Sequence, residues 1–142
     1  MRLALKEAEK AFDEGEIPVG AIVVKDQRVI GRGHNQVENL NDPTAHAEII
    51  AIGAAAGEVK SWRLVGCTIY VTLEPCAMCA GAIVLARLSR LVFGAFDPRA
   101  GACGSLMNII QDERLNHHID LTSGILSQEC SGILKSFFQT LR

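Results

Sequence analysis

Short apolar runs alternate along the chain with segments in which apolar residues recur every three or four positions. The uninterrupted runs are rich in β-branched residues and predict buried strands. These strands are expected at residues 19–24, 28–35, 67–74 and 90–97, with a fifth near 118–121. A tight connection at Lys25 and Asp26 joins the first two runs, which indicates an antiparallel hairpin.

The periodic segments predict helices with one apolar face. They are expected before Gly15, from 42 to about 57, from 75 onward, briefly at 106–110, and at 126–141. The second helix is predicted to begin with Asp42 as its N-cap and Pro43 at the first helical position. Helices that alternate with buried strands indicate an α/β fold with three layers, α/β/α, around a mixed, largely parallel five-stranded sheet. No linker or internal repeat divides the sequence, so residues 1–142 are predicted to form a single domain.

The amino-acid composition limits the kinds of protein that this chain can be. A hydrophobic content of 49% argues against disorder. The longest apolar stretch, around CAGAIVLA, is too short to span a bilayer, and the N-terminus lacks the apolar run of a signal peptide. We therefore expect a cytoplasmic protein with no membrane segment. The net charge of −2 does not mark a nucleic-acid binder, so any RNA contact has to come from a local patch.

Five cysteines, an odd number, favour a reducing compartment and metal or catalytic use over a disulfide framework. Cys76 and Cys79 are three residues apart in the predicted first turn of a helix, so both sulfurs are expected on one face, at the positive end of the helix dipole. His46, in the first turn of the preceding helix, can complete a His/Cys/Cys set. Three protein ligands leave a fourth position open for water, which is typical of a catalytic zinc rather than a structural one. One Zn²⁺ per chain is predicted.

Each half of this pattern has another interpretation by itself. A histidine at a helix start often caps the helix or faces solvent, and a lone CxxC motif between strand and helix also suits a thioredoxin-like redox pair. Together, HAE at residues 46–48 and PCxxC at 75–79 match the H-x-E and P-C-x-x-C signature of the zinc base deaminases.

Glu48 lies two residues after His46, about 200° away on a regular helix, so it is badly placed as a second ligand. Zinc with two thiolates and a neutral imidazole carries no net charge and acidifies its water weakly, so a carboxylate beside the water is needed as a base. We expect Glu48 to take a proton from the zinc-activated water, pass it to a ring nitrogen and protonate the leaving amino group.

Longer motifs give a resemblance to a known family. They are EIPVGA at 16–21, HNQ at 34–36, DPTAHAE at 42–48, TLEPCAMCAGAIVLAR at 72–87, FGAFDPRAGACGSLMN at 93–108 and LNH at 115–117. Through them the chain resembles, over nearly its whole length, the bacterial tRNA-specific adenosine deaminases of the cytidine deaminase-like zinc superfamily. The resemblance implies that fold, a homodimer, and hydrolytic deamination of adenosine to inosine at the wobble position of a tRNA anticodon loop.

The same resemblance assigns four residues to the substrate. Asn35 would hydrogen-bond the flipped adenine, the backbone around Ala47 would read its edge, Val19 would wall the pocket, and Asp97 would contact the sugar. Structural roles are open for three of them: a strand-end turn for Asn35, a loop for Asp97 and the core for Val19.

Other assignments also have two interpretations. Phe96 is expected either to stack on a base or to pack. Positively charged side chains that would form a phosphate-binding patch, or simply be solvated, are Arg87, Arg90 and Arg99. Two other functions remain open: a small-molecule deaminase acting on guanine, cytosine or a nucleoside, and a non-catalytic zinc protein.

Overall fold

The computed structural model describes residues 1–141. Its elements, in chain order, are α1 (Arg2–Asp13), β1 (Gly20–Lys25), β2 (Arg28–His34), α2 (Val37–Leu40), α3 (Ala47–Val59), β3 (Thr68–Leu73), α4 (Ala77–Leu85), β4 (Arg90–Ala95), β5 (Asp120–Thr122) and α5 (Ser127–Thr140).

The strands form one mixed sheet in the order β2-β1-β3-β4-β5. β1 pairs antiparallel with both β2 and β3, whereas β3–β4 and β4–β5 are parallel. The predicted hairpin and the mixed five-stranded α/β sheet are confirmed, but only two of the four pairings are parallel, rather than most of them. The reason is the crossover through α3, which carries the chain past β1 and separates β3 from β2.

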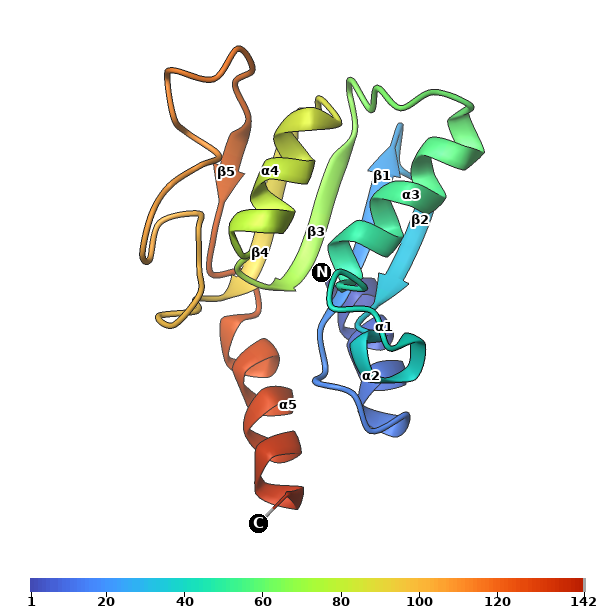
Figure 1. Ribbon diagram of the computed structural model, residues 1–142, viewed down its shortest axis with the longest axis vertical. Helices are drawn as coiled ribbons and strands as arrows, with labels where there is room; N and C mark the ends of the chain where they lie inside the picture. The colour runs from blue at the N-terminus through green and yellow to red at the C-terminus, as the bar shows by residue number, and fades with distance from the viewer. Residues whose placement is uncertain (142) are drawn as a thin grey trace.

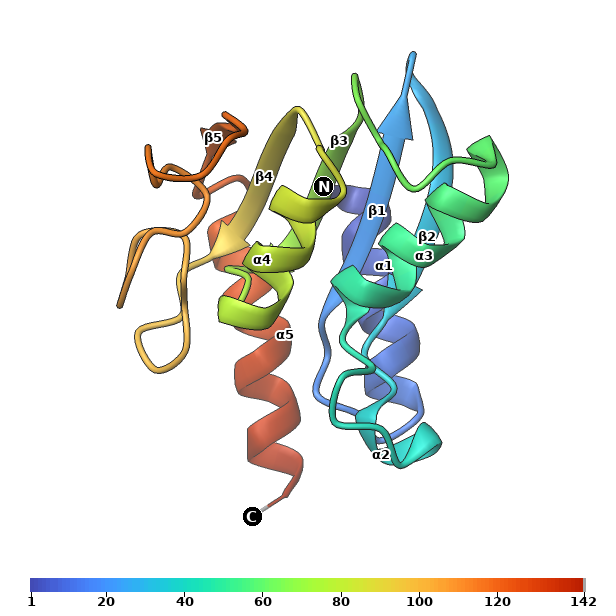
Figure 2. The ribbon, with the colours of Figure 1, turned by 45° about the horizontal axis from the view of Figure 1, so that its top comes forward.

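Helices cover both faces of the sheet (Figure 1). α3 and α4 lie on one face, and α1 and α5 lie on the other, as the turned view in Figure 2 also shows. Fully buried side chains of β3 and β4, among them Ile69, Val71 and Phe93, form the centre of the core. This arrangement directs the N-termini of α3 and α4 and the carboxyl ends of β3 and β4 to the same edge of the sheet.

Helix α3 packs unusually close to β2. A Cβ atom added to Gly33 would lie 2.3 Å from the Ala47 carbonyl oxygen and 2.7 Å from the Ala51 nitrogen. The face of α3 that approaches the strand consists of small residues, and Ala47 and Ala51 are both fully buried. Because Ala47 directly follows His46, this contact also fixes the start of α3 at the candidate site.

We expect Gly33→Ala to lower the free energy of unfolding by about 2–3 kcal/mol, because the obstructing atoms are backbone and cannot rotate away. Gly53→Ala on the same helix is the matched control, since a Cβ atom there would meet nothing within 4 Å. That control should stabilise the protein by up to about 1 kcal/mol, because alanine favours a helix interior more than glycine does. Urea unfolding of both variants measures the difference. Equal changes in the free energy of unfolding of the two variants, in the same direction, would contradict the close approach of α3 to Gly33.

The structure differs from the predicted elements at three places. The helix expected from Asp42 begins instead at Ala47, because the Asp42 carboxylate accepts hydrogen bonds from the Thr44 nitrogen and hydroxyl and holds residues 42–44 in a turn. The short α2, which was not predicted, precedes that turn. Residues 106–110 contain no helix, and Asn108 among them forms an isolated bridge with Cys103.

The remaining predicted elements agree with the structure within a few residues, and the C-terminal amphipathic helix is confirmed as α5. Within residues 1–141, no helix has both the length and the apolar character that crossing a membrane requires.

Candidate active site

Three potential metal donors meet where β3 ends and α3 and α4 begin. The Nδ1 atom of His46 lies 3.6 Å from the Cys76 sulfur and 3.5 Å from the Cys79 sulfur, and the three donor atoms all lie within 4.8 Å of one another. His46 and Cys76 are the N-cap residues of α3 and α4, so both stand just before their helices rather than in the predicted first turns. Cys79 is in the first turn of α4, as expected.

These residues fit a zinc ion. With Zn–N near 2.0–2.1 Å and Zn–S near 2.3 Å, a tetrahedral site separates nitrogen from sulfur by about 3.6 Å. The separations between His46 and the two sulfurs match that edge length. The three donors come from the starts of two helices, and His46 and Cys76 also line the pocket described below.

The protonation of the two cysteines differs. A hydrogen bond from the Cys79 thiol, followed by one with His46, lowers the pKa of Cys76 to about 3. The same contact with Cys76, together with burial, raises the pKa of Cys79. The pair therefore holds one thiolate at neutral pH, and a metal that takes both sulfurs would displace the remaining proton.

Glu48 occupies the second helical position of α3 and is only 4% exposed. The angle of about 200° for a regular helix does not describe it, because the extended backbone of His46, with ψ 152°, precedes the helix. This change of backbone direction lets His46 and Glu48 border the same pocket. Burial raises the pKa of the Glu48 carboxyl.

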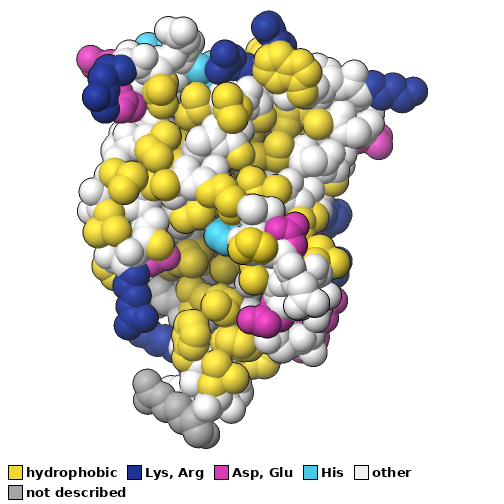
Figure 3. Space-filling view, in the orientation of Figure 1, with side chains coloured by type: hydrophobic (Ala, Val, Ile, Leu, Met, Phe, Trp, Pro, Cys, Tyr) yellow, Lys and Arg dark blue, Asp and Glu magenta, His cyan; other side chains and the backbone are white. Residues whose placement is uncertain are grey.

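A pocket of about 650 Å³ opens beside the metal donors. The four residues that the resemblance assigns to substrate all line it: Val19, Asn35, Ala47 and Asp97. Sequence reasoning missed the part of the wall to which α5 contributes Phe137 and Phe138, together with its C-cap residue Leu141. These residues belong to the segment 126–141, which was predicted only as a helix with one apolar face, and Phe138 is 46% exposed. Figure 3 shows hydrophobic side chains spread over the middle of this face and down toward α5.

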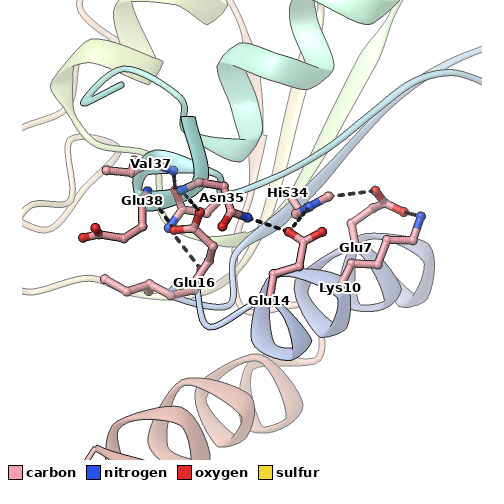
Figure 4. A network of polar contacts seen from close by, with 10 residues as sticks. Glu7, Lys10, Glu14, Glu16, His34, Asn35, Val37 and Glu38 are labelled. Carbon is pink, nitrogen blue, oxygen red and sulfur yellow. Dashed lines mark hydrogen bonds and ion pairs between the residues drawn. The ribbon is translucent and has the colours of Figure 1, made fainter. Parts of the chain in front are cut away.

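The Asn35 amide shapes the wall of this pocket as well as facing it. Its nitrogen donates to the Ile17 carbonyl at 3.2 Å, and its oxygen accepts from the Val37 nitrogen at 3.2 Å (Figure 4). Beside it, the buried Glu16 carboxylate accepts from the Glu38 nitrogen at 3.0 Å and from the next backbone nitrogen at 2.8 Å. Asn35 therefore does form the strand-end turn that the sequence suggested for it. Glu16 anchors α2 at the rim of the pocket.

Asp97 follows β4 and begins the loop on the opposite wall. Its Oδ1 atom accepts from the Arg99 and Ala100 nitrogens at 3.0 and 3.2 Å, which forms a tight turn. Within residues 1–141 its Oδ2 atom has no hydrogen-bond partner. This oxygen is therefore free to accept a bond from a ligand.

The three arginines considered for phosphate binding do not lie together. Arg87 follows the C-terminal end of α4, and Arg90 is the first residue of β4. Both positions are at the end of their element away from the metal donors, and Arg90 donates to Thr122 at 2.8 Å. Only Arg99 belongs to the Asp97 turn. Phe96 packs edge-on against Phe93 with ring centroids 5.2 Å apart, and it is 56% exposed.

Comparison with known proteins agrees with this geometry. A family model of MafB19-like deaminases matches residues 1–142. The tRNA-specific adenosine deaminase of Bacillus subtilis is 51% identical over 142 residues, which cover 100% of this chain and 88% of the relative. The enzyme of the same name from Haemophilus influenzae is 52% identical over 143 residues, which cover 100% of this chain and 83% of the relative. The chain belongs to the tRNA-specific adenosine deaminase family.

Solved structures of this family and of more distant deaminases share the fold. A structure from work on A-to-I editing by tRNA:A34 deaminases at the wobble position of transfer RNA superposes with a TM-score of 0.90 at 46% identity, over 94% of this chain and 96% of that one. A guanine deaminase from Nitrosomonas europaea superposes with a TM-score of 0.83 at 21% identity, over 96% of this chain and 81% of that one. The second likeness establishes the fold alone, and the first extends to the family.

Proposed function

We propose that this member of the tRNA-specific adenosine deaminase family hydrolytically converts adenosine to inosine at the wobble position of a tRNA anticodon loop, with one Zn²⁺ per chain. The observation that carries the proposal is the placement of a buried carboxylate, Glu48, beside the His46, Cys76 and Cys79 donor set in one pocket. Relatives that bear this activity in their names match the chain along its full length.

The metal would be held by His46, Cys76 and Cys79. Zinc bound there supplies a water of lowered pKa in its open position, which can attack a carbon at neutral pH. The two thiolates and the neutral imidazole leave the centre without net charge, so a base close to the water has to complete the activation.

Glu48 is the residue that moves protons. It accepts a proton from the attacking water and donates it to the ring nitrogen next to the reacting carbon, as the carbon–oxygen bond forms. It would then take the second proton from the hydroxyl now bonded to that carbon and deliver it to the amino group, which leaves as ammonia as the carbon–nitrogen bond breaks and the carbonyl forms. The sum is adenosine and water giving inosine and ammonia, with Glu48 returned to its starting state. Its burial keeps bulk water away from these transfers.

The pocket suits a base that has been turned out of a single strand. Asn35 and the backbone around Ala47 would bind the edge of the adenine, Val19 would contact its face, and the free Oδ2 atom of Asp97 would accept a hydrogen bond from the ribose. The apolar side chains of α5 offer surfaces on which flanking bases can stack. Unstacking costs only a few kcal/mol and least in a preformed loop, which favours an anticodon loop over duplex RNA.

Contacts with phosphate would come first from Arg99, which lies in the Asp97 turn. Arg87 and Arg90 lie away from the pocket and would reach only RNA that is distant from the reacting base. The net charge of −2 makes such local contacts necessary.

The reaction would take place in the cytoplasm, because all five cysteines are free thiols in the structure and two of them belong to the metal set. We further propose a homodimer. Exposed apolar side chains of α4 and of the loop between α3 and β3 would provide a surface for the second copy: Trp62, Val65, Met78 and Leu85. Sedimentation equilibrium would detect the dimer.

The deciding experiment measures inosine formation from a short anticodon stem-loop that carries adenosine at the wobble position. Free adenine, guanine, cytosine and adenosine are assayed beside it with the same zinc-loaded protein. Conversion of the stem-loop alone is expected. Conversion of a free base or nucleoside alone would replace the proposal by a small-molecule deaminase, and no conversion of any substrate would favour a non-catalytic zinc protein.

Asp97→Asn tests the sugar contact. The variant keeps an oxygen for the turn to Arg99 but presents an amide where the carboxylate would accept from the ribose 2′-hydroxyl, so the preference for RNA over DNA should fall by about tenfold. The measurement compares a stem-loop with adenosine and one with deoxyadenosine at the target position. Asp112→Asn is the matched control, because Asp112 forms a similar turn with Arg114 outside the pocket. Unchanged discrimination in Asp97→Asn would exclude this role.

A further inference from the structure

Glu74 is a buried carboxylate that the chemistry above does not use. It directly follows β3 and is 2% exposed. Its Oε1 atom accepts from the Asp97 nitrogen at 2.9 Å and from the Ser105 hydroxyl. Its Oε2 atom accepts from the nitrogens of Cys103 and Ser105, each at 3.0 Å. One side chain therefore satisfies four donors, all of them in the segment 97–105.

The segment that Glu74 binds has little regular structure of its own. Residues 97–105 contain no helix or strand apart from the isolated bridge at Cys103. The segment approaches Glu74 so closely that a Cβ atom at Gly101 would lie 2.3 Å from the carboxyl carbon. A second tie comes from the neighbouring residue, because the Pro75 carbonyl accepts from the Ala102 nitrogen at 2.9 Å. The loop is thus fastened to the turn that leads into Cys76.

This connection joins two parts of the candidate site. The turn at 74–76 supplies a metal donor, Cys76, while the loop supplies Asp97 and Ala100 to the wall of the pocket. Without the Glu74 bonds, the Asp97 backbone nitrogen would lose its partner, and the ends of the loop would no longer be held relative to the metal donors. A glutamine cannot replace the carboxylate, because its amide nitrogen would face backbone N–H donors.

We propose that Glu74 is a positioning residue, which holds the 97–105 loop against the Cys76 turn and so sets where Asp97 meets the nucleotide relative to the reacting base. This inference rests on the proposed function for the identity of the nucleotide. The loop anchoring itself does not depend on that identity, so it can be tested without any substrate.

The first test is amide hydrogen exchange on zinc-loaded protein, with the wild type compared with Glu74→Gln. Protection of the Asp97, Cys103 and Ser105 amides should fall by at least about tenfold, as expected when charge-assisted hydrogen bonds are lost. Zinc stoichiometry should stay at the wild-type value. Glu16→Gln is the matched control, since it removes another buried carboxylate and should expose the amides of Glu38 and Asn39 but not those of the 97–105 loop. Unchanged loop protection in Glu74→Gln would overturn the proposal.

The second test is kinetic and separates positioning from general destabilisation. At a temperature where both proteins are folded, Glu74→Gln should raise KM for the stem-loop by about tenfold and change kcat less. Combining it with Asp97→Ala should add little, because both changes remove the same contact with the nucleotide. The proposal would be overturned if the increases in KM of the two single variants multiplied in the double variant. It would also be overturned if Glu74→Gln lowered kcat and left KM unchanged. Failure of the wild type to convert the stem-loop would instead count against the proposed function, and the exchange result would still decide the anchoring.

Ser105→Ala keeps the inference testable should Glu74→Gln fail to fold. It removes one of the four donors and leaves the buried carboxylate in place. Protection of the loop amides and affinity for the stem-loop should then both fall, by less than in Glu74→Gln. Wild-type values for both quantities would contradict the proposal.

Discussion

The Glu48→Gln variant is expected to bind zinc with wild-type stoichiometry and to lose roughly 10³-fold or more of its turnover of the stem-loop. Glutamine fills the same buried volume, so the variant leaves no cavity next to Ala47 at the start of α3. What it removes is the ability to accept and return a proton. Since each catalytic cycle requires a transfer to the ring and another to the leaving amino group, both steps should fail together.

A matched control is available on the same helix. Glu58 lies near the end of α3 and is exposed, so Glu58→Gln makes the same chemical change at a distance from the pocket and should retain wild-type turnover. Glu48→Ala should behave like Glu48→Gln in activity, with a further loss of stability from the cavity that it creates. Mass spectrometry measures the zinc content and single-turnover kinetics measures the rate, so a loss of metal is distinguished from a loss of proton transfer. Near-wild-type rates in Glu48→Gln would show that another group carries the proton.

Much of the fold was predictable because the hydrophobic pattern reflects burial directly. Strands β1, β3 and β4 are apolar over most of their length, and α5 shows the three- and four-residue period of a helix that packs on one side. The parallel share of the sheet was overstated. Pattern alone does not show which neighbour a strand joins, and β3 joins β1.

The candidate site was predictable in its chemistry and less so in its geometry. The residue types and spacing of HAE and PCxxC predicted three candidate donors that the structure brings together, but the position of Glu48 depends on where α3 begins. The sequence offers Asp42 and Pro43 as a helix start, and the structure uses them in a turn at 42–44 that precedes the N-cap residue His46. Because the backbone of His46 is extended rather than helical, His46 and Glu48 can border one pocket.

The anchoring carboxylates could not be assigned from sequence, because their partners are backbone nitrogens far along the chain. Glu16 binds the start of α2, and Glu74 binds a loop that begins 23 residues later. The available signal is an acidic residue placed directly beside an apolar run, where an unpaired charge would be costly to bury. That signal indicates a partner without indicating which one.

Removal of zinc is expected to abolish turnover and to lower the thermal midpoint. If zinc is present at about 1,000 times its Kd, its loss costs about 4 kcal/mol, or roughly 10 °C for a domain of this size. The loss should be large because the donors come from two helix starts, so the ion ties α3 to α4 at the edge of the sheet. Dialysis against a chelator, followed by titration with Zn²⁺, should restore both properties at one equivalent per chain.

Two cysteine variants make this result specific to the proposed donors. Cys79→Ala should bind zinc far more weakly and be inactive, whereas Cys67→Ala, a buried cysteine just before β3 at the other end of that strand, should bind one zinc and stay active. Both substitutions remove the same sulfur atom from a buried position, so a difference between them reports on the metal rather than on packing. If Cys76 and Cys79 served instead as a redox pair, activity would survive metal removal and depend on thiol oxidation. The approach of His46 to within 3.6 Å of both sulfurs argues for the metal, because a dithiol that cycles through a disulfide requires no third ligand.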